Sequence, residues 1–301
     1  MKKIKFLLLS LVALTLFSAC GTTSVVPVTG RKHTLLVSDA EVLSLSNQEY
    51  TKYMRSAKRS SNAANTAMVQ RVGKRLATAV EGYLRNNGMG SEIQNFQWEF
   101  NLVADQNVNA FCMPGGKIVV YEGLLPITQN ESALAVVLGH EIAHAVAKHS
   151  AEQMSKKMRQ QYATQIGGAV LGQIAGQSTA SIATAIAQQG FQFANLKYSR
   201  DDETEADHIG LIFAAMAGYD PAVAVPFWQR MAALGGGSKS DIFSDHPSDT
   251  KRIAAIQALL PTANKYYQAS GYAPVQSVRV GSAAKSSAKS TKKTGKKSTR
   301  K

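Results

Sequence analysis

Two histidines and a glutamate near the middle of the chain have the spacing of a metal-binding catalytic motif. His140, Glu141 and His144 read His-Glu-x-x-His. Residues four positions apart on a helix lie about 40° apart around its axis, so the two imidazoles can share one small cation. Glu141 lies beside them, where a carboxylate can accept a proton from a water that the cation activates. The motif predicts metal-dependent hydrolysis; the alternative is a helix with two surface histidines.

The element that must carry this motif is a helix, and the flanking residues favour one. Thr128 and Glu131 have the spacing of a capping box, which closes the first turn of a helix. Small and apolar residues recur on one face, namely Ala133, Leu134, Val137, Leu138, Ile142 and Ala143. We therefore expect the helix to begin near Thr128.

A catalytic zinc site needs a third protein ligand, and the same helix offers none. In the metzincin arrangement a glycine and a third histidine follow, but Ala147 and Ser150 occupy these positions. His149 cannot substitute, because on this helix it is rotated by about 180° from His140 and faces away from the metal. We expect His149 to have a structural or surface role.

A second helix, beginning at Ser199, carries the remaining candidate ligands. Ser199 is a favourable N-cap residue, and acids crowd the first turn from Asp201 onward. Glu203 and Asp207 share a face, so Glu203 could bind the metal while Asp207 accepts the spare ring N–H of a ligating histidine. Glu205 points about 200° away from Glu203, so only one of the two can serve. Acids in a first turn also occur simply as partners of the helix dipole, and spacing alone leaves this alternative open.

Several motifs in a fixed order resemble those of a known peptidase family. They are Asn109-Ala110-Phe111, Pro114-Gly115-Gly116, the His-Glu-x-x-His motif, Ser199-Arg200-x-x-Glu203-x-x-Ala206-Asp207, and His246-Pro247 with Arg252. Over about residues 39–260 the chain is similar to the HtpX and CAAX prenyl endopeptidase family of zinc metallopeptidases, most of all its soluble periplasmic branch. The resemblance implies an α+β fold: a mostly helical, zincin-like metallopeptidase domain with a small mixed sheet.

The resemblance also implies the chemistry of the site. It makes Glu203 the third ligand of one Zn²⁺ per chain, with His140 and His144. It makes Glu141 the general base that activates the attacking water, and it leaves Asp207 as the support of a ligand histidine.

The remaining roles implied by the resemblance concern the substrate. His246 and Arg252 are expected to donate to the oxyanion, and in the periplasmic relatives the histidine can instead occupy the water position on the metal. Asn109 and Ala110 lie where an edge strand would hold an extended polypeptide substrate. An ordinary sheet edge is the alternative for these two residues.

The first residues have the features of a targeting signal. Residues 1–19 have a basic start and a short apolar core, as in a signal peptide. Small residues before Cys20 resemble a bacterial lipobox, which predicts a lipid on Cys20 and an extended, lipidated tether over 20–37; ordinary signal cleavage is the alternative. These features predict a protein anchored by lipid to the bacterial envelope, in the outer membrane facing the periplasm. With Cys20 acylated, Cys112 has no disulfide partner, and we expect it to be a packed apolar residue.

The metallopeptidase domain is predicted to span residues 38–265. Helices are expected from Ser38 to about Ala57, over 65–87, from Arg200 to Gly218, and after Pro247 to about Leu260. Strands are expected over 96–103 and on both sides of the Pro114-Gly115-Gly116 turn. Residues 160–196 carry no charge, but Gln, Ser and Thr are too frequent for a membrane span, so we expect a helical hairpin that does not cross the bilayer.

The carboxyl end differs in composition from the rest of the chain. Residues 266–301 are predicted to be a basic, low-complexity and disordered tail. Residues 250–301 hold 12 Lys or Arg and no acid, so most of the formal net charge of +14 lies there. Because aromatic residues are lacking after Tyr272, the tail does not resemble a nucleic-acid binder. Anionic lipid or the cell wall is the expected partner, and a merely solubilising tail is the alternative.

Together these features predict a zinc-dependent endopeptidase. Its substrates would be polypeptides, in particular unfolded or misassembled envelope proteins. The alternative is an outer-membrane assembly or chaperone-like factor with a latent or structural zinc site; an intact Glu141 argues against it, since a structural site needs no base.

Overall fold

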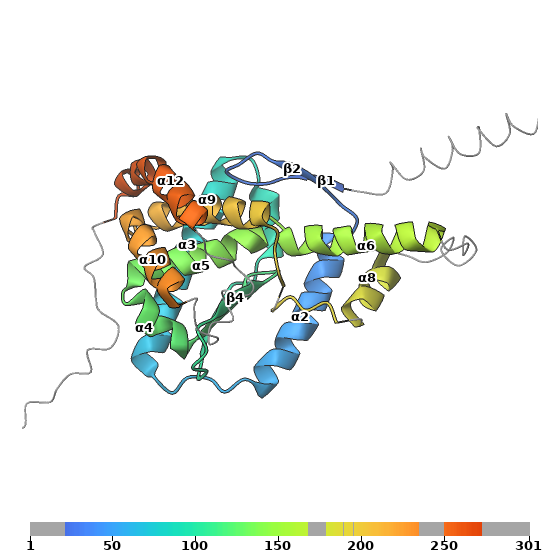
Figure 1. Ribbon diagram of the computed structural model, residues 1–301, viewed down its shortest axis with the longest axis horizontal. Coiled ribbons are helices and arrows are strands. Elements are labelled where there is room, and N and C mark those ends of the chain that lie inside the picture. The colour runs from blue at the N-terminus through green and yellow to red at the C-terminus, as the bar shows by residue number, and fades with distance from the viewer. Residues whose placement is uncertain (1–21, 168–178, 189, 195, 235–249, 273–301) are drawn as a thin grey trace, which may run out of the picture.

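The computed structural model describes residues 22–167, 179–188, 190–194, 196–234 and 250–272, and these form helices around a small mixed sheet (Figure 1). The helices in chain order are α2 (Asp39–Ser56), α3 (Ala63–Asn86), α4 (Leu125–Thr128), α5 (Glu131–Val146), α6 (His149–Gly167), α8 (Thr179–Gln188), α9 (Arg200–Met216), α10 (Ala224–Leu234) and α12 (Thr250–Ala269). The strands are β1 (Thr22–Val25), β2 (Lys32–Leu35), β3 (Glu99–Val103), β4 (Ala110–Met113) and β5 (Lys117–Tyr121). The predicted α+β class, mostly helical, is confirmed.

The sheet beside the site has three strands in the order β3-β5-β4. β5 runs parallel to β3, with Phe100 opposite Ile118, and antiparallel to β4, with Ala110 opposite Val120. β4 is therefore an edge strand of a mixed sheet. It packs against α5, the helix that carries the His-Glu-x-x-His motif.

Side-chain caps set the start of both helices that carry candidate ligands. Ser199 and Asp202 form a reciprocal capping box at the start of α9, as the sequence predicted for Ser199. The predicted start of α5 at Thr128 is wrong, because the Thr128 hydroxyl donates to the Leu125 carbonyl and Thr128 ends the short helix α4. Asn130 caps α5 instead, and its side chain accepts the Ala133 N–H at 2.9 Å.

α5 is the central helix of the domain. Fifteen of its sixteen residues are buried, and α3, α9 and β4 pack around it. It meets α9 where Gly139 and Gly210 face each other. A Cβ on Gly139 would lie 2.6 Å from the Gly210 carbonyl oxygen, so only glycine permits this approach of the two backbones.

The chain turns sharply between α5 and α6. Lys148 adopts a left-handed conformation with φ 56°, which is uncommon for a residue other than glycine. Its ammonium lies 2.8 Å from Asp39 and 2.8 Å from Glu92, two contacts that hold the turn. α6 then begins at His149, so the helix does not continue through His149 as the sequence analysis assumed.

The amino-terminal segment is not an extended tether over its whole length. β1 and β2 form an antiparallel hairpin, with Thr22 opposite Leu35, that lies against α6 (Figure 1). Val26 and Leu35 are buried, and the Tyr83 hydroxyl accepts the Val28 N–H. The hairpin is therefore part of the folded domain.

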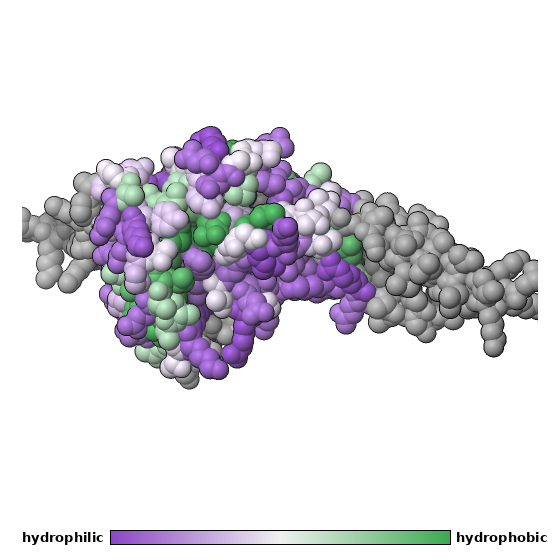
Figure 2. Space-filling model, turned by 90° about the horizontal axis from the view of Figure 1, so that it is seen from above, coloured by the Kyte–Doolittle hydropathy of each residue, from purple (hydrophilic) through white to green (hydrophobic). Residues whose placement is uncertain are grey.

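The other predicted elements agree with the structure to within a few residues, except at the end of the domain. α12 continues through Pro261 to Ala269, beyond the predicted end at Leu260 and the predicted boundary at residue 265. α6 and α8 lie side by side and extend from the body (Figure 1). Among the described helices, none has the length and apolar character that crossing a bilayer requires. Figure 2 shows one face of the molecule, on which hydrophobic side chains are interspersed with hydrophilic ones.

Some predictions concern residues outside the described ranges. These are the signal peptide, Cys20, His246 and nearly all of the basic tail.

Candidate metal centre

Three buried side chains from two helices converge at the crossing of α5 and α9. The Nε2 atoms of His140 and His144 lie 3.1 Å apart. One oxygen of Glu203 lies 3.3 Å from the His140 Nε2, and the other lies 3.4 Å from the His144 Nε2. All three residues are at most 4% exposed. The structure thus brings together the two histidines of the motif and the glutamate that the resemblance nominates.

The spacing of these atoms fits a zinc ion. Zinc bonds to imidazole nitrogen and carboxylate oxygen are about 2.0–2.2 Å long, and tetrahedral geometry then places ligand atoms about 3.4 Å apart. Donors of the three residues lie within 4.8 Å of one another, and the closest approaches are those given above. Two imidazoles and one carboxylate are also the donor set of known catalytic zinc sites. The residues present therefore fit the metal.

His140 contacts the carboxylate of Asp207, and Arg252 in turn donates hydrogen bonds to this carboxylate. The Asp207 carboxylate lies 2.9 Å from the His140 Nδ1, the position predicted for Asp207. A ring N–H donated to Asp207 directs the lone pair of the His140 Nε2 towards Glu203 and His144. The Arg252 Nε and Nη2 each donate to Asp207 at 2.7 Å, and its Nη1 lies 3.2 Å from Glu203.

Arg252, a predicted oxyanion donor, contacts two carboxylates of the site. Its guanidinium faces Asp207 and Glu203 and stacks over Trp228, with 3.6 Å between the guanidinium carbon and the ring centroid. Arg252 is 8% exposed, on α12. It is placed to compensate buried charge and to hold Asp207.

His149 lies behind His144 and does not face away from it. The two Nδ1 atoms are 2.9 Å apart, and the His149 Nε2 lies 3.1 Å from a Glu205 carboxylate oxygen. The left-handed turn at Lys148 redirects His149 towards α9, and no glycine or proline in the sequence signals this turn. The orientation predicted for His149 is therefore wrong, although its buried contacts agree with the predicted structural role, and Glu205 lies away from the three candidate ligands as predicted.

Tyr198, just before α9, was also missed. Its ring stacks on the His144 ring, with the centroids 3.9 Å apart and the planes 18° apart, and its hydroxyl lies 2.9 Å from the Ser150 hydroxyl. Burial raises the pKa of Tyr198. Its place directly before the N-cap Ser199 was the only available sequence signal.

Electrostatics favour a cation at the centre. Burial lowers the pKa of His140, but the Glu203 carboxylate and the hydrogen bond to Asp207 outweigh burial and raise this pKa to about 9. His144 shows the opposite result, because burial lowers its pKa well below the usual value. A proton is thus drawn to the point where the three donors meet, as a metal ion would be.

Glu141 is 2% exposed and lies on α5 between the two histidines. Cys112 on β4 is buried nearby, and burial together with the Glu141 charge raises the pKa of its thiol well above the usual value. The Cys112 thiol is therefore protonated and packed at neutral pH, not a nucleophile.

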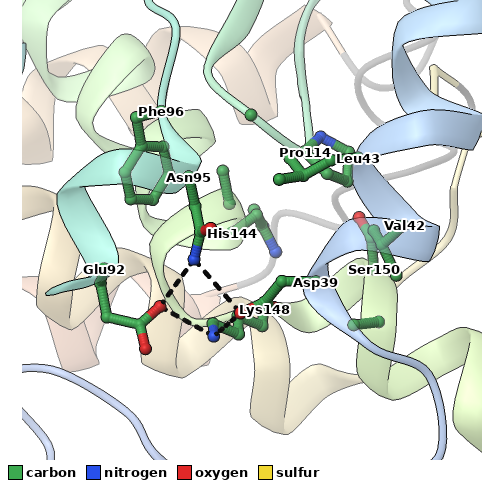
Figure 3. A pocket seen from close by; sticks show the side chains of 13 residues that line it. Asp39, Val42, Leu43, Glu92, Asn95, Phe96, Pro114, His144, Lys148 and Ser150 are labelled. Carbon is green, nitrogen blue, oxygen red and sulfur yellow. Dashed lines mark hydrogen bonds and ion pairs between the residues drawn. The ribbon is translucent and has the colours of Figure 1, made fainter.

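Two of the cavities beside the centre differ in size. One, of about 260 Å³, is lined by Tyr198, Arg200, Glu203, Thr204, Lys251, Arg252 and Ala255. The other holds about 30 Å³ beside His144, and Figure 3 shows Lys148 at one side of it between Asp39 and Glu92. Of these two, the larger cavity has room for a substrate side chain.

The comparison with protein families decides the family. The model of peptidase family M48 matches residues 63–260, which include the three candidate ligands, Glu141, Asp207 and Arg252. The chain belongs to peptidase family M48. Members of this family are zinc-dependent, in agreement with the donor set described above.

Individual relatives extend the match. The chain is 40% identical over 192 residues to the mitochondrial metalloendopeptidase OMA1 of Arabidopsis thaliana, covering 64% of this chain and 37% of the relative. It is 31% identical over 253 residues to the OMA1 protein of Saccharomyces cerevisiae, covering 81% and 71%. It is 28% identical over 222 residues to the metalloprotease LoiP of Escherichia coli, covering 73% and 81%. The chain therefore spans little more than a third of the Arabidopsis protein.

These relatives refine one prediction and correct another. Because both OMA1 proteins and LoiP match, the comparisons show the M48 family but not the HtpX and CAAX prenyl endopeptidase branch. The predicted location in a bacterial outer membrane is wrong on these findings, since the relatives with the higher identities are mitochondrial proteins. The prediction of the location relied on a short lipobox-like pattern at Cys20. A match over 192 residues is much stronger evidence than a pattern of a few residues.

Proposed function

We propose that this chain is a zinc-dependent endopeptidase that cleaves extended segments of polypeptide. The observation that carries the proposal is the meeting of the His140, His144 and Glu203 donor atoms at 3.1–3.4 Å, with Glu141 beside them. Zinc, when bound, supplies Lewis acidity: it polarises a carbonyl oxygen and makes water acidic enough to lose a proton near neutral pH.

Glu141 is the general base in this proposal. A carboxylate next to both ligand histidines is placed to accept a proton from the attacking water and to return it to the leaving amine. It is buried on α5, the helix that packs against β4.

Asp207 and Arg252 act as positioning residues. Asp207 fixes the ring of His140 by accepting its Nδ1–H, and Arg252 fixes Asp207 with two donated hydrogen bonds. Supports of this kind orient the ligand and raise its basicity.

The substrate backbone is proposed to lie along β4. This strand is at the edge of the sheet and packs on α5, so a polypeptide paired to it would run beside the metal centre. The Asn109 side chain accepts the Ala110 N–H at 2.8 Å, which orients its amide group at this edge for contact with an incoming strand. Extended pairing of this type favours unfolded segments as substrates.

Removal and return of the metal tests the proposal. The purified full chain should bind one zinc ion and cleave an unfolded, fluorescently labelled protein. A chelator should abolish cleavage and zinc should restore it. The variants His140→Ala and Glu203→Ala should lose both zinc and activity, whereas Asp201→Asn, at an exposed acid of the same first turn, should retain both. Full cleavage by the metal-free chain would refute the proposal.

A further inference from the structure

The two ligand histidines are supported from opposite sides of the domain. His140 is held by Asp207, which is held by Arg252. On the other side, His144 contacts His149, and His149 contacts Glu205. This second series of contacts, from His144 through His149 to Glu205, does not end on α9. It continues into the hairpin of β1 and β2, which lies outside the residues that the M48 model matches.

The turn of this hairpin supplies two donors to Glu205. The Thr29 hydroxyl donates to one carboxylate oxygen at 2.5 Å, and the Arg31 Nε donates to the other at 2.7 Å. The turn is well defined, because the Val26 N–H donates to the Arg31 carbonyl and the Gly30 N–H donates to Val26. Arg31 therefore donates to the Glu205 carboxylate as Arg252 donates to the Asp207 carboxylate.

The direction of the hydrogen bonds follows from the metal site. If the His144 Nε2 presents its lone pair to the metal, its Nδ1 carries the proton and donates to the His149 Nδ1. His149 must then carry its own proton on Nε2 and donate it to Glu205. The Glu205 carboxylate accepts hydrogen bonds from His149, Thr29 and Arg31. Every donor in this series therefore meets an acceptor. His149 is fully buried and Glu205 is 9% exposed, which shields the series from water.

We propose that Thr29 and Arg31 are positioning residues for the metal ligand His144 and act on it through Glu205 and His149. The amino-terminal hairpin then completes the metal centre, and the domain defined by the family model alone lacks this support. The tautomer and the angle of the His144 ring are set in this way. A carboxylate with two outside donors stays ionised and stays in place, as a support for a ligand histidine requires.

The test is the zinc affinity of the full-length chain, measured by competition with a chromophoric chelator, together with the absorption spectrum of the Co²⁺-loaded form. Supports of ligand histidines typically contribute 10- to 100-fold to metal affinity. We expect a loss of this size in His149→Leu and in the double variant Thr29→Val with Arg31→Gln. His149→Gln, which keeps one acceptor and one donor, should recover much of the affinity. The Co²⁺ spectrum should shift in the first two variants.

Matched controls separate this route from docking of the hairpin in general. Arg31 also contacts Glu152, and Arg159 donates to the Thr34 carbonyl of the same hairpin at 2.5 Å. Glu152→Gln and Arg159→Gln loosen the hairpin without touching Glu205, and both should keep the affinity within about twofold. If His149→Leu fails to fold, the double variant decides, since its changes lie in a turn at the surface.

The inference rests on the zinc site of the proposed function, and the two fail in different ways. Absence of stoichiometric zinc in the wild type would refute the proposed function. Zinc bound equally tightly by the wild type and by the hairpin double variant would overturn only the role of the hairpin. An equal loss in the double variant and in both controls would also overturn it.

Discussion

Gly139 of α5 and Gly210 of α9 touch backbone to backbone one residue before the ligand His140. A Cβ on Gly210 would lie 2.6 Å from the Gly139 carbonyl carbon and 2.6 Å from the His140 nitrogen. The two helices approach closely only because both residues lack a side chain. This crossing sets the distance between the histidines on α5 and the glutamate on α9.

Gly210→Ala should therefore damage both stability and metal binding. Backbone atoms cannot move aside as a flexible side chain can, so we expect a loss of about 1–3 kcal/mol in the free energy of unfolding, as for overpacked cores. Zinc affinity should fall as α9 moves away from α5. Gly82→Ala on α3 is the matched control, because nothing lies within 4 Å of the added Cβ. It should be neutral or stabilising by up to about 1 kcal/mol. Equal effects in denaturant unfolding would contradict this account.

Arg252→Gln distinguishes a positioning residue from an oxyanion donor. Removing one partner of a buried ion pair typically costs about 3–5 kcal/mol, because the other charge remains buried and unpaired. We expect a loss of this order in unfolding free energy, together with altered zinc affinity. The double variant Arg252→Gln with Asp207→Asn should be less destabilised than the sum of the two single variants. Normal stability and zinc affinity with only a reduced kcat would instead support the oxyanion role.

The sequence predicted the chemistry of the site better than its surroundings. The spacing of His140 and His144 and the acids after Ser199 correspond to local helix geometry, which a sequence displays directly. The resemblance then selected Glu203. His149 was misplaced because the break at Lys148 depends on contacts with Asp39 and Glu92, which are distant in sequence. The hairpin was mistaken for a tether for the same reason, since Thr29 and Arg31 find their partner Glu205 about 175 positions away.

Glu152 should make the stability of the domain depend on pH. The hydrogen bond from His33 and the contacts with Arg31 lower the pKa of Glu152, although burial opposes the shift. A carboxylate with a lowered pKa in the folded state stabilises it above the unfolded pKa of about 4.3, and this contribution is lost as the pH falls further. Because Arg31 is partly exposed, we expect Glu152→Gln to cost about 1 kcal/mol at pH 7 and less at pH 3. Denaturant unfolding at both pH values measures the difference. The same cost at pH 3 as at pH 7 would contradict the assignment.

Asn109 tests the proposed substrate strand. If a polypeptide pairs with β4, the loss of the Asn109 side chain should disturb the register of binding and raise KM. We expect kcat/KM to fall about tenfold in Asn109→Ala, which corresponds to about one hydrogen bond. Asn109→Asp, which keeps an acceptor for the Ala110 N–H, should fall less. An unchanged KM in both variants, measured with an unstructured peptide, would indicate an ordinary sheet edge.

The comparison of the wild type with Glu141→Gln, for zinc content and for cleavage of an unfolded protein, tests the central claim most directly. Glu141 is the proposed base and not a ligand, so the amide should leave one zinc ion per chain in place. Cleavage should fall by at least 10²-fold, the lower end of the usual contribution of a general base. A Glu141→Gln variant that holds zinc and cleaves as fast as the wild type would contradict the proposed peptidase mechanism.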